Sequence, residues 1–310
     1  MLKNPFLWYD GSEVLLNDNS DPDVPESGQG GNMKQRIAIV TGGTSGIGLA
    51  GAEALSSAGY RVYTFSRRGN EGKPSEGASG ICHMAVDVTS EEAVKAAVDE
   101  IAEKEGRIDL VVNCAGFGIS GAIEFTSLQD AKRLMDVDFF GTVNVNRAVI
   151  PLMRAQGMAE GGFEAGRIIN ISSVAGPAAI PFQAYYSCAK AAVDAYTAAL
   201  ANELKPFHIT VCAIRPGDVK TGFTAAREKK HEGNEIYGGR IDKSVAKMEH
   251  DEKTGASPRV LGRYILKISG IRNPKPFYTP GIVYKACVLL IKLLPCRLVN
   301  NLIGMLYVVK

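Results

Sequence analysis

The stretch Thr41-Gly42-Gly43-Thr44-Ser45-Gly46-Ile47-Gly48 decides the fold of this 310-residue chain. It follows residues 36–41, an apolar run rich in β-branched side chains that predicts a strand buried on both faces. A helix-like segment over residues 47–58 comes next. Gly42, Gly46 and Gly48 allow the backbone to turn tightly and to approach a pyrophosphate at the amino end of that helix. We therefore predict a phosphate-binding turn; a turn with incidental glycines is the alternative.

Strands and helices alternate from this turn onwards. Such alternation predicts an α/β fold with a single doubly wound parallel sheet of the Rossmann type and helices on both faces. We expect strands at 36–41, 61–66, 82–86, 109–113, 167–172 and 209–214, and helices at 47–58, 91–105, 134–156 and 184–205. We assign residues 34–310 to this one domain. Residues 1–33, rich in Gly, Pro, Asp, Asn and Ser, are expected to form a flexible tail.

The carboxyl-terminal third departs from this rhythm. Residues 218–255 are polar and rich in glycine, and we expect an irregular segment that acts as a substrate lid. Ser257-Pro258 then predicts the start of a helix that runs to about Ser269. Residues 281–310 are expected to form an apolar extension of two helices, 282–294 and 297–308.

Further motifs follow the glycine-rich stretch in order. They are Asn113-Cys114-Ala115-Gly116, Ser173 thirteen residues before Tyr186, Tyr186-Ser187-Cys188-Ala189-Lys190 and Pro216-Gly217. Together with the TGxxxGxG pattern, they resemble the short-chain dehydrogenase/reductase family over about residues 36–224. The resemblance implies an oxidoreductase that moves a hydride between a nicotinamide cofactor and a carbonyl or alcohol, with a general acid/base at Tyr186.

The resemblance also implies the site residues. The catalytic group would be Ser173, Tyr186, Lys190 and Asp138. The cofactor would be held by Gly42, Thr44, Ser45, Gly46, Ile47, Gly48, Ser66, Arg67, Arg68, Asp87, Val88, Asn113, Ala115, Gly116, Tyr186, Lys190, Pro216, Gly217, Val219 and Thr221.

The chemistry of Tyr186 and Lys190 supports their assignment independently. Spaced i and i+4, they share one helix face. A free tyrosine has a pKa of ~10, and a neighbouring ammonium with an oxidised nicotinamide favours the phenolate. We expect Tyr186 to act as the acid in reduction and the base in oxidation. Ser173 would stabilise the charge on the substrate oxygen, and Lys190 would also hold the cofactor ribose, as in the family. Tyr185 has Ala189 at i+4 and is a poorer candidate.

Asp138 departs from the family pattern, in which most relatives carry asparagine. That asparagine helps to hold a water in a proton relay to the lysine. Asp138 either preserves the relay as a tolerated isostere or places a negative charge near Lys190 that alters how the lysine tunes Tyr186.

Ser66-Arg67-Arg68 stands after the second strand, where enzymes for NAD place an acid to hold the ribose 2′-hydroxyl. A hydroxyl and a guanidinium bind a 2′-phosphate instead. We therefore predict NADP as the cofactor; arginines that only face solvent are the alternative. Asp87-Val88 matches the family's adenine contact.

The substrate class and surroundings follow less directly. The 115–121 stretch and the long extension resemble the 17-beta-hydroxysteroid dehydrogenase-like branch, which implies a lipophilic steroid- or retinoid-like substrate. The alternatives are a 3-oxoacyl thioester reductase and a catalytically idle NADP(H)-binding regulatory protein. We expect a homodimer or homotetramer. No nucleic-acid partner is expected, and the four histidines predict no metal site.

Charge is distributed unevenly. Residues 1–33 hold one basic residue against six acids, whereas residues 253–310 hold ten lysines and arginines and no acid. Six cysteines without a CxxC pair, and a first segment unlike a signal peptide, predict a cytoplasmic protein. Lys285 and Lys292 share a helix face and suggest peripheral contact with an anionic membrane. Packing over the substrate pocket or against a subunit is the alternative.

Overall fold

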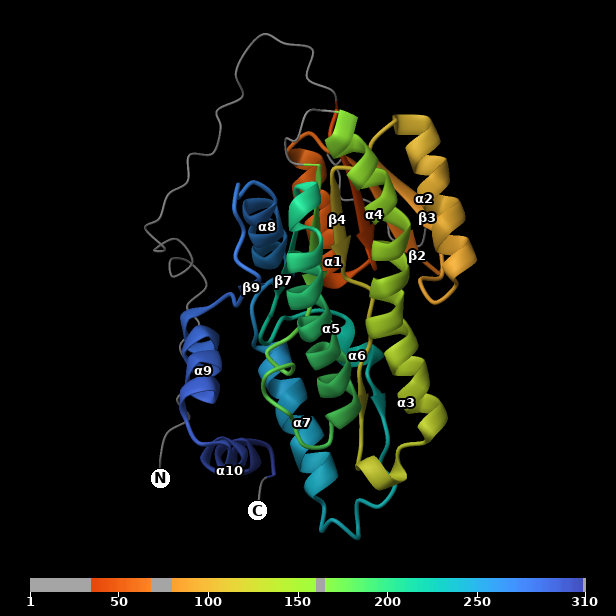
Figure 1. The fold of residues 1–310 in the computed structure, drawn as a ribbon. Helices are drawn as coiled ribbons and strands as arrows, with labels where there is room; N and C mark the ends of the chain where they lie inside the picture. The colour runs from red at the N-terminus through yellow and green to blue at the C-terminus, as the bar shows by residue number, and fades with distance from the viewer. Residues whose placement is uncertain (1–34, 68–79, 160–164, 309–310) are drawn as a thin grey trace.

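The computed structural model describes residues 35–67, 80–159 and 165–308 (Figure 1). Seven parallel strands form one sheet in the order β3-β2-β1-β4-β6-β7-β9. Their bounds are β1 Ile37–Thr41, β2 Arg61–Ser66, β3 Ile81–Ala85, β4 Leu110–Asn113, β6 Gly166–Ile171, β7 Ile209–Ile214 and β9 Phe277–Tyr278. The order reverses between β1 and β4, and such a switch point leaves a crevice at the carboxyl ends of the strands. The predicted doubly wound fold is confirmed.

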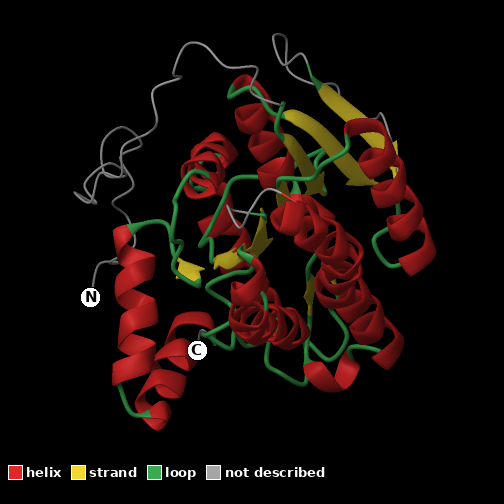
Figure 2. Cartoon of the chain, turned by 45° about the horizontal axis from the view of Figure 1, so that its top comes forward, coloured by secondary structure: helices red, strands yellow, loops and turns green. Residues whose placement is uncertain are grey.

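Helices cover both faces of the sheet (Figure 2). One face packs against α2, α4 and α5, and the other against α1 and α8. The bounds are α1 Gly46–Ser57, α2 Glu91–Glu105, α3 Leu128–Met135, α4 Gly141–Ala159, α5 Ala184–Glu203, α6 Phe223–Ala226, α7 Arg240–Lys253, α8 Pro258–Ser269, α9 Ile282–Leu293 and α10 Cys296–Tyr307. Short 3₁₀ turns lie at Ile123–Phe125 and Lys205–Phe207.

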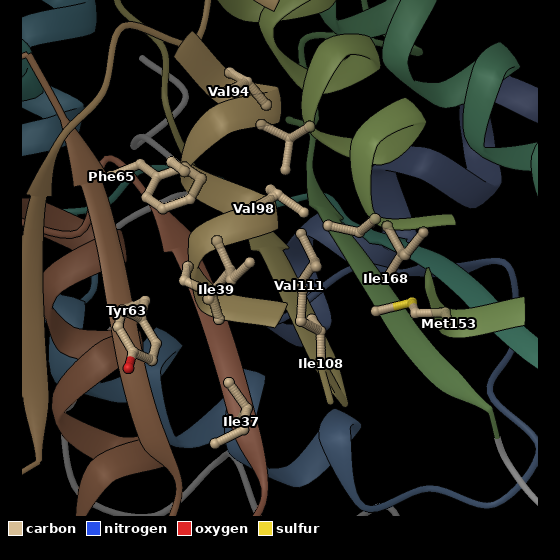
Figure 3. Packing of buried hydrophobic residues seen from close by; sticks show 14 of the residues in the cluster. Ile37, Ile39, Tyr63, Phe65, Val94, Val98, Ile108, Val111, Met153 and Ile168 are labelled. Atoms are coloured by element: carbon tan, nitrogen blue, oxygen red, sulfur yellow. The ribbon is translucent and has the colours of Figure 1, made fainter. Parts of the chain in front are cut away.

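The core beneath α2 and α4 consists of aliphatic and aromatic side chains of the strands together with apolar side chains of these two helices (Figure 3). Ile39 of β1 and Val111 of β4 are completely buried, as are Val98 of α2 and Met153 of α4. Strands with apolar residues on both faces need helices on both sides, because exposed β-branched surface would cost about 25 cal/mol per Å². The continuous apolar runs in the sequence therefore account for the layered arrangement.

The structure corrects two expectations about local structure. The helix expected over 134–156 is interrupted by one π-helical turn, Asp136–Phe140, and α3 precedes it with Ser127 Oγ capping the Asp130 amide at 3.0 Å. Residues 218–255 are not irregular throughout, because they contain α6, the short strand β8 Glu228–Lys229 and the fourteen-residue helix α7. β8 pairs with β5 Ile119–Ser120 apart from the main sheet.

The amphipathic spacing of α7 explains why it forms a helix. Ile241, Val245 and Met248 are spaced i, i+4 and i+7, and all three are buried with Ser244. The many charges between them obscured this pattern in the sequence.

The last two helices lie at one side of the molecule in both views (Figures 1 and 2). α9 and α10, close to the expected bounds, are joined by a sharp bend at Pro295 (Figure 1); we call the pair the carboxyl-terminal hairpin, and its α10 contacts α7. Among the described residues, no helix combines the length and the apolar character that crossing a membrane requires.

Candidate functional site

The glycine-rich turn connects β1 to α1 in a way that only glycine allows. Gly42 and Gly46 have φ of +64° and +55°, in the left-handed region. A Cβ on Gly48 would lie 2.4 Å from the main-chain oxygen of Gly42. Ser45, at the amino end of α1, caps no amide of the described residues with its side chain, and the first turn of α1 holds no acid. The main-chain amides of the glycine turn and of the first turn of α1, together with the helix dipole, are therefore suited to bind a phosphate anion.

The end of β4 packs directly against this turn. Thr41 Oγ1 accepts hydrogen bonds of 2.9 Å from the amides of both Cys114 and Ala115. A Cβ on Gly42 would lie 3.1 Å from the backbone of Ala115. The structure thus brings together the first glycine and the Asn113–Gly116 motif, which are far apart in the chain.

Asn113 itself points into a buried amide network. Its Nδ2 donates to Asn146 Oδ1 at 2.8 Å and to Asn170 Oδ1 at 2.9 Å, and Asn170 Nδ2 donates to Thr197 Oγ1 at 2.9 Å. These contacts tie β4 to α4, β6 and α5. Asn146, Asn170 and Thr197 were not predicted as site residues, because nothing in their local sequence separates them from surface amides and hydroxyls.

Tyr186 and Lys190 lie on one face of α5, with Lys190 Nζ 5.4 Å from the centre of the Tyr186 ring. Lys190 Nζ also donates to the Ile171 carbonyl at 3.3 Å. Burial raises the pKa of Tyr186, whereas the Lys190 ammonium and a hydrogen bond with Ser173 lower it. Ser173 follows β6, and its Oγ accepts from the Ala175 amide at 3.1 Å. The three side chains therefore meet at the carboxyl edge of the sheet.

Asp138 enters the same group from the π-helical turn. Its side chain is buried, with Oδ2 3.1 Å from Lys190 Nζ, and Oδ1 accepts from the Phe117 amide at 2.9 Å. Burial raises the pKa of Asp138, and the ammonium opposes that effect. For Lys190, burial alone lowers the pKa, but Asp138 and Tyr186 leave it raised. Asp138, the residue that departs from the family pattern, thus forms an ion pair with Lys190 next to Tyr186.

The ends of the outer strands carry the other expected cofactor residues. β2 ends at Ser66, and Arg67 is exposed directly after it; Arg68 lies outside the described residues. After β3, Asp87 Oδ1 accepts from the amide and hydroxyl of Thr89 at 2.9 and 2.8 Å. Val88 is buried. Since β3, β2 and β1 are neighbours, these residues lie along one edge that begins at the glycine turn.

The turn after β7 is covered by the carboxyl-terminal hairpin. A Cβ on Gly217 would lie 2.1 Å from the Tyr284 ring. Tyr284 Oη donates to Asp218 Oδ2 at 2.7 Å and accepts from the Asp218 amide at 3.0 Å. Beyond the turn, Val219 bridges to Ala256. Tyr284, through which helix α9 packs on the Pro216-Gly217 motif, was not predicted from the sequence.

Segment α6 closes the site over Tyr186. The Phe223 ring lies 5.6 Å from the Tyr186 ring, centre to centre. Thr224 Oγ1 donates to Glu252 Oε2 of α7 at 2.6 Å, and Arg227 pairs with the same carboxylate. Thr221 lies against Gly46 of the glycine turn. Phe223, Arg227 and Glu252 were also missed, because only the fold brings α6 and α7 to α5.

The family model described as short chain dehydrogenase matches residues 36–232. The chain belongs to the short-chain dehydrogenase/reductase family and is an oxidoreductase that acts on carbonyl or alcohol groups with a nicotinamide dinucleotide.

Two relatives and one solved structure illustrate the likeness. A 3-ketodihydrosphingosine reductase of Bacteroides thetaiotaomicron is 41% identical over 249 residues, which are 80% of this chain and 88% of that protein. A 3-hydroxyacyl-CoA dehydrogenase type-2 of Drosophila melanogaster is 37% identical over 207 residues, 64% of this chain and 80% of that protein. A short-chain dehydrogenase of Streptomyces avermitilis has a TM-score of 0.73 at 26% identity, covering 87% of this chain and 96% of that structure.

Proposed function

We propose that this protein reduces a long-chain 3-ketosphingoid base to its alcohol, with NADPH as the reductant. The observation that carries the proposal is the 41% identity to a 3-ketodihydrosphingosine reductase over 80% of the chain, together with the Ser173, Tyr186 and Lys190 group. The relatives favour a lipid ketone, as the sequence did. They lend no specific support to the steroid branch, and we therefore propose the sphingoid ketone as the substrate in preference to a steroid or a retinoid.

The residues support a direct proton-transfer mechanism. The glycine turn at residues 42–48 and Lys190 would hold the reduced nicotinamide dinucleotide, whose chemistry there would be to supply the hydride that the carbonyl carbon receives. Tyr186 donates its phenolic proton to the carbonyl oxygen, so that ketone, hydride and proton give a secondary alcohol. Ser173 donates a hydrogen bond to the same oxygen and stabilises its developing charge. The Lys190 ammonium, 5.4 Å from the Tyr186 ring, stabilises the phenolate that remains.

The turn after β2 supports NADPH over NADH. The ribose 2′-phosphate would approach Ser66 and Arg67, where an acid would repel it. Ser66→Asp tests this choice, and we expect it to lower kcat/KM with NADPH by at least tenfold and to raise it with NADH. Better use of NADH by the unmodified protein would overturn the cofactor proposal.

The segments α6 and α7 support the role of residues 218–255 as a substrate cover. Phe223 lies on the Tyr186 ring, and the pairing of Arg227 with Glu252 ties α6 to α7. Phe223 lies beside the Tyr186 ring, so a substrate bound at the phenol would contact α6. The aromatic ring would then line the path of an apolar chain.

A substrate panel tests the proposed reaction. We expect the highest kcat/KM with 3-ketodihydrosphingosine, below it a ketosteroid, retinal and acetoacetyl thioesters, when oxidation of NADPH is followed. Faster turnover of acetoacetyl thioesters would favour the 3-oxoacyl thioester reductase, the alternative that the Drosophila relative supports. No turnover of any ketone would favour the idle NADP(H)-binding protein.

The tyrosine is tested by a matched pair of variants. Tyr186→Phe should lose more than 99% of kcat while its Kd for NADPH stays within twofold, because the phenol moves the proton and adds little to cofactor affinity. Tyr185→Phe, the neighbouring control, should keep most of the activity. Retention of several per cent of kcat by Tyr186→Phe would remove Tyr186 from its role.

A further inference from the structure

The hairpin of α9 and α10 exposes an unusually apolar surface. Leu293 of α9 is 70% exposed and Met305 of α10 is 71% exposed. We call the following residues the hairpin face: Ile282, Val283, Leu289, Leu290, Leu293, Leu298, Leu302, Met305 and Leu306, all of which are exposed. Large apolar side chains gathered on one element mark an interaction site, whereas scattered ones do not.

Both α9 and α10 contribute apolar side chains to the hairpin face. In α9, Ile282, Leu289 and Leu293 are spaced i, i+7 and i+11, which places them on one side, while Val288 and Tyr284 point to the protein. In α10, Leu298, Leu302 and Met305 follow the i, i+4, i+7 pattern in the same way. Both helices therefore hold the domain with one side and leave an apolar stripe on the other.

Charge decides what occupies this face. Lys285, Lys292 and Arg297 are exposed beside the stripe, and residues 253–310 hold no acid at all. Around the axis of α9, Lys285 and Lys292 lie between the apolar stripe and the side of the helix that contacts the protein. Lysine side chains in that position extend their ammonium groups to anionic headgroups while the stripe enters the acyl boundary. An apolar protein partner gives no reason for basic residues without acids.

The length of the helices decides how they would lie. Each has twelve residues, and at 1.5 Å per residue neither reaches across a hydrocarbon core of ~30 Å. They are suited to lie in the plane of the interface.

We propose that α9 and α10 bind the surface of an anionic membrane through the hairpin face. Tyr284 joins this surface to the active site, because its ring packs on Gly217 and its hydroxyl bonds to Asp218. The turn after β7 would thus lie close to the bilayer. A lipid substrate would pass from the bilayer to the active site over a short path. This statement about the substrate rests on the proposed function. Membrane binding itself does not depend on it.

Co-sedimentation of the full-length protein with vesicles tests the proposal without measuring turnover. We expect binding to vesicles of phosphatidylcholine with 30% phosphatidylglycerol at low salt, weaker binding at high salt because screening shortens the reach of the charges, and little binding to phosphatidylcholine alone. No sedimentation with the anionic vesicles at low salt would overturn the proposal, whatever the enzyme turns out to reduce.

Two pairs of variants separate the apolar and the basic contributions. Leu289→Ser with Leu293→Ser should abolish binding, whereas Met158→Ser, at a residue of α4 that is 80% exposed, should not change it. Lys285→Glu with Lys292→Glu should weaken binding by at least 25-fold, at about fivefold per lysine near an anionic surface. Lys267→Glu, in the same acid-free region but on α8, is the control. Equal losses from the control variants would overturn the assignment to the hairpin face.

Two other occupants of the face give different results. If the face joins two copies of this chain, light scattering will show an oligomer that the leucine variants dissociate, and vesicles will not bind. If the acid-rich residues 1–33 cover it, only a variant without residues 2–32 will bind vesicles. Either result would overturn the proposal for the full-length chain, whereas vesicle binding by both proteins supports it.

Discussion

Replacing Asp138 by asparagine removes a negative charge 3.1 Å from Lys190 Nζ and leaves a side chain of nearly the same shape. Lys190 Nζ is 5.4 Å from the centre of the Tyr186 ring. Asp138 Oδ2 is therefore at most about 8.5 Å from that centre, where two unit charges interact by about 2 kcal/mol at an effective dielectric constant of about 20.

The sign follows from the phenolate. Asp138 raises the pKa of Tyr186, because a negative charge on its carboxylate repels the phenolate. We expect Asp138→Asn to lower the pKa of Tyr186, provided that Lys190 keeps its charge without its partner.

The pH dependence of kcat/KM for alcohol oxidation measures this shift. Oxidation requires the phenolate, so its rate rises with pH through the pKa of Tyr186, and the inflection should move to lower pH in Asp138→Asn. Asp136→Asn, an exposed carboxylate on the same π-helical turn, should leave the inflection in place. An unmoved inflection, or one at higher pH because Lys190 has lost its proton, would refute the reasoning. A thermal melt of both variants checks that they fold.

The remaining predictions concern the turns and the tail. Gly48→Ala places a Cβ 2.4 Å from a main-chain oxygen, so we expect a loss of about 1–3 kcal/mol in unfolding free energy and weaker binding of the dinucleotide; Gly304→Ala, whose Cβ meets no described atom within 4 Å, is the control, and equal stability of the two variants would contradict the packing. Tyr284→Phe leaves the Asp218 amide and carboxylate without their bonds of 3.0 and 2.7 Å and should cost about 1–3 kcal/mol in urea unfolding; an unchanged midpoint would show that the hydroxyl contributes nothing. Deletion of residues 2–32 should leave Tm and kcat nearly unchanged, since the tail lacks an apolar pattern to pack, and a fall of several degrees would show that it docks.

Much of the fold was predictable because its signals are local. The glycines at 42, 46 and 48 predict a turn that only glycine can form, and the apolar runs predict strands buried on both faces. The i, i+4 spacing places Tyr186 and Lys190 on one helix face before any tertiary contact is known. The two terminal helices were likewise found close to their observed bounds, because Pro295 separates them.

Other features depend on contacts between segments that are distant in the chain. β9 has two residues and becomes a strand only by pairing with β7. The many charged residues of α7 hide its apolar spacing in the sequence, and only the contacts of α7 with α6 and α10 show which side of the helix is buried. The sequence itself determined that Asp138 departs from its family and that residues 253–310 carry bases without acids. Only the tertiary structure decided that Asp138 pairs with Lys190, that Tyr284 lies on Gly217, and which sides of α9 and α10 remain exposed. The physical reason is that spacing along the chain defines the faces of a helix, whereas packing alone determines which face is removed from water.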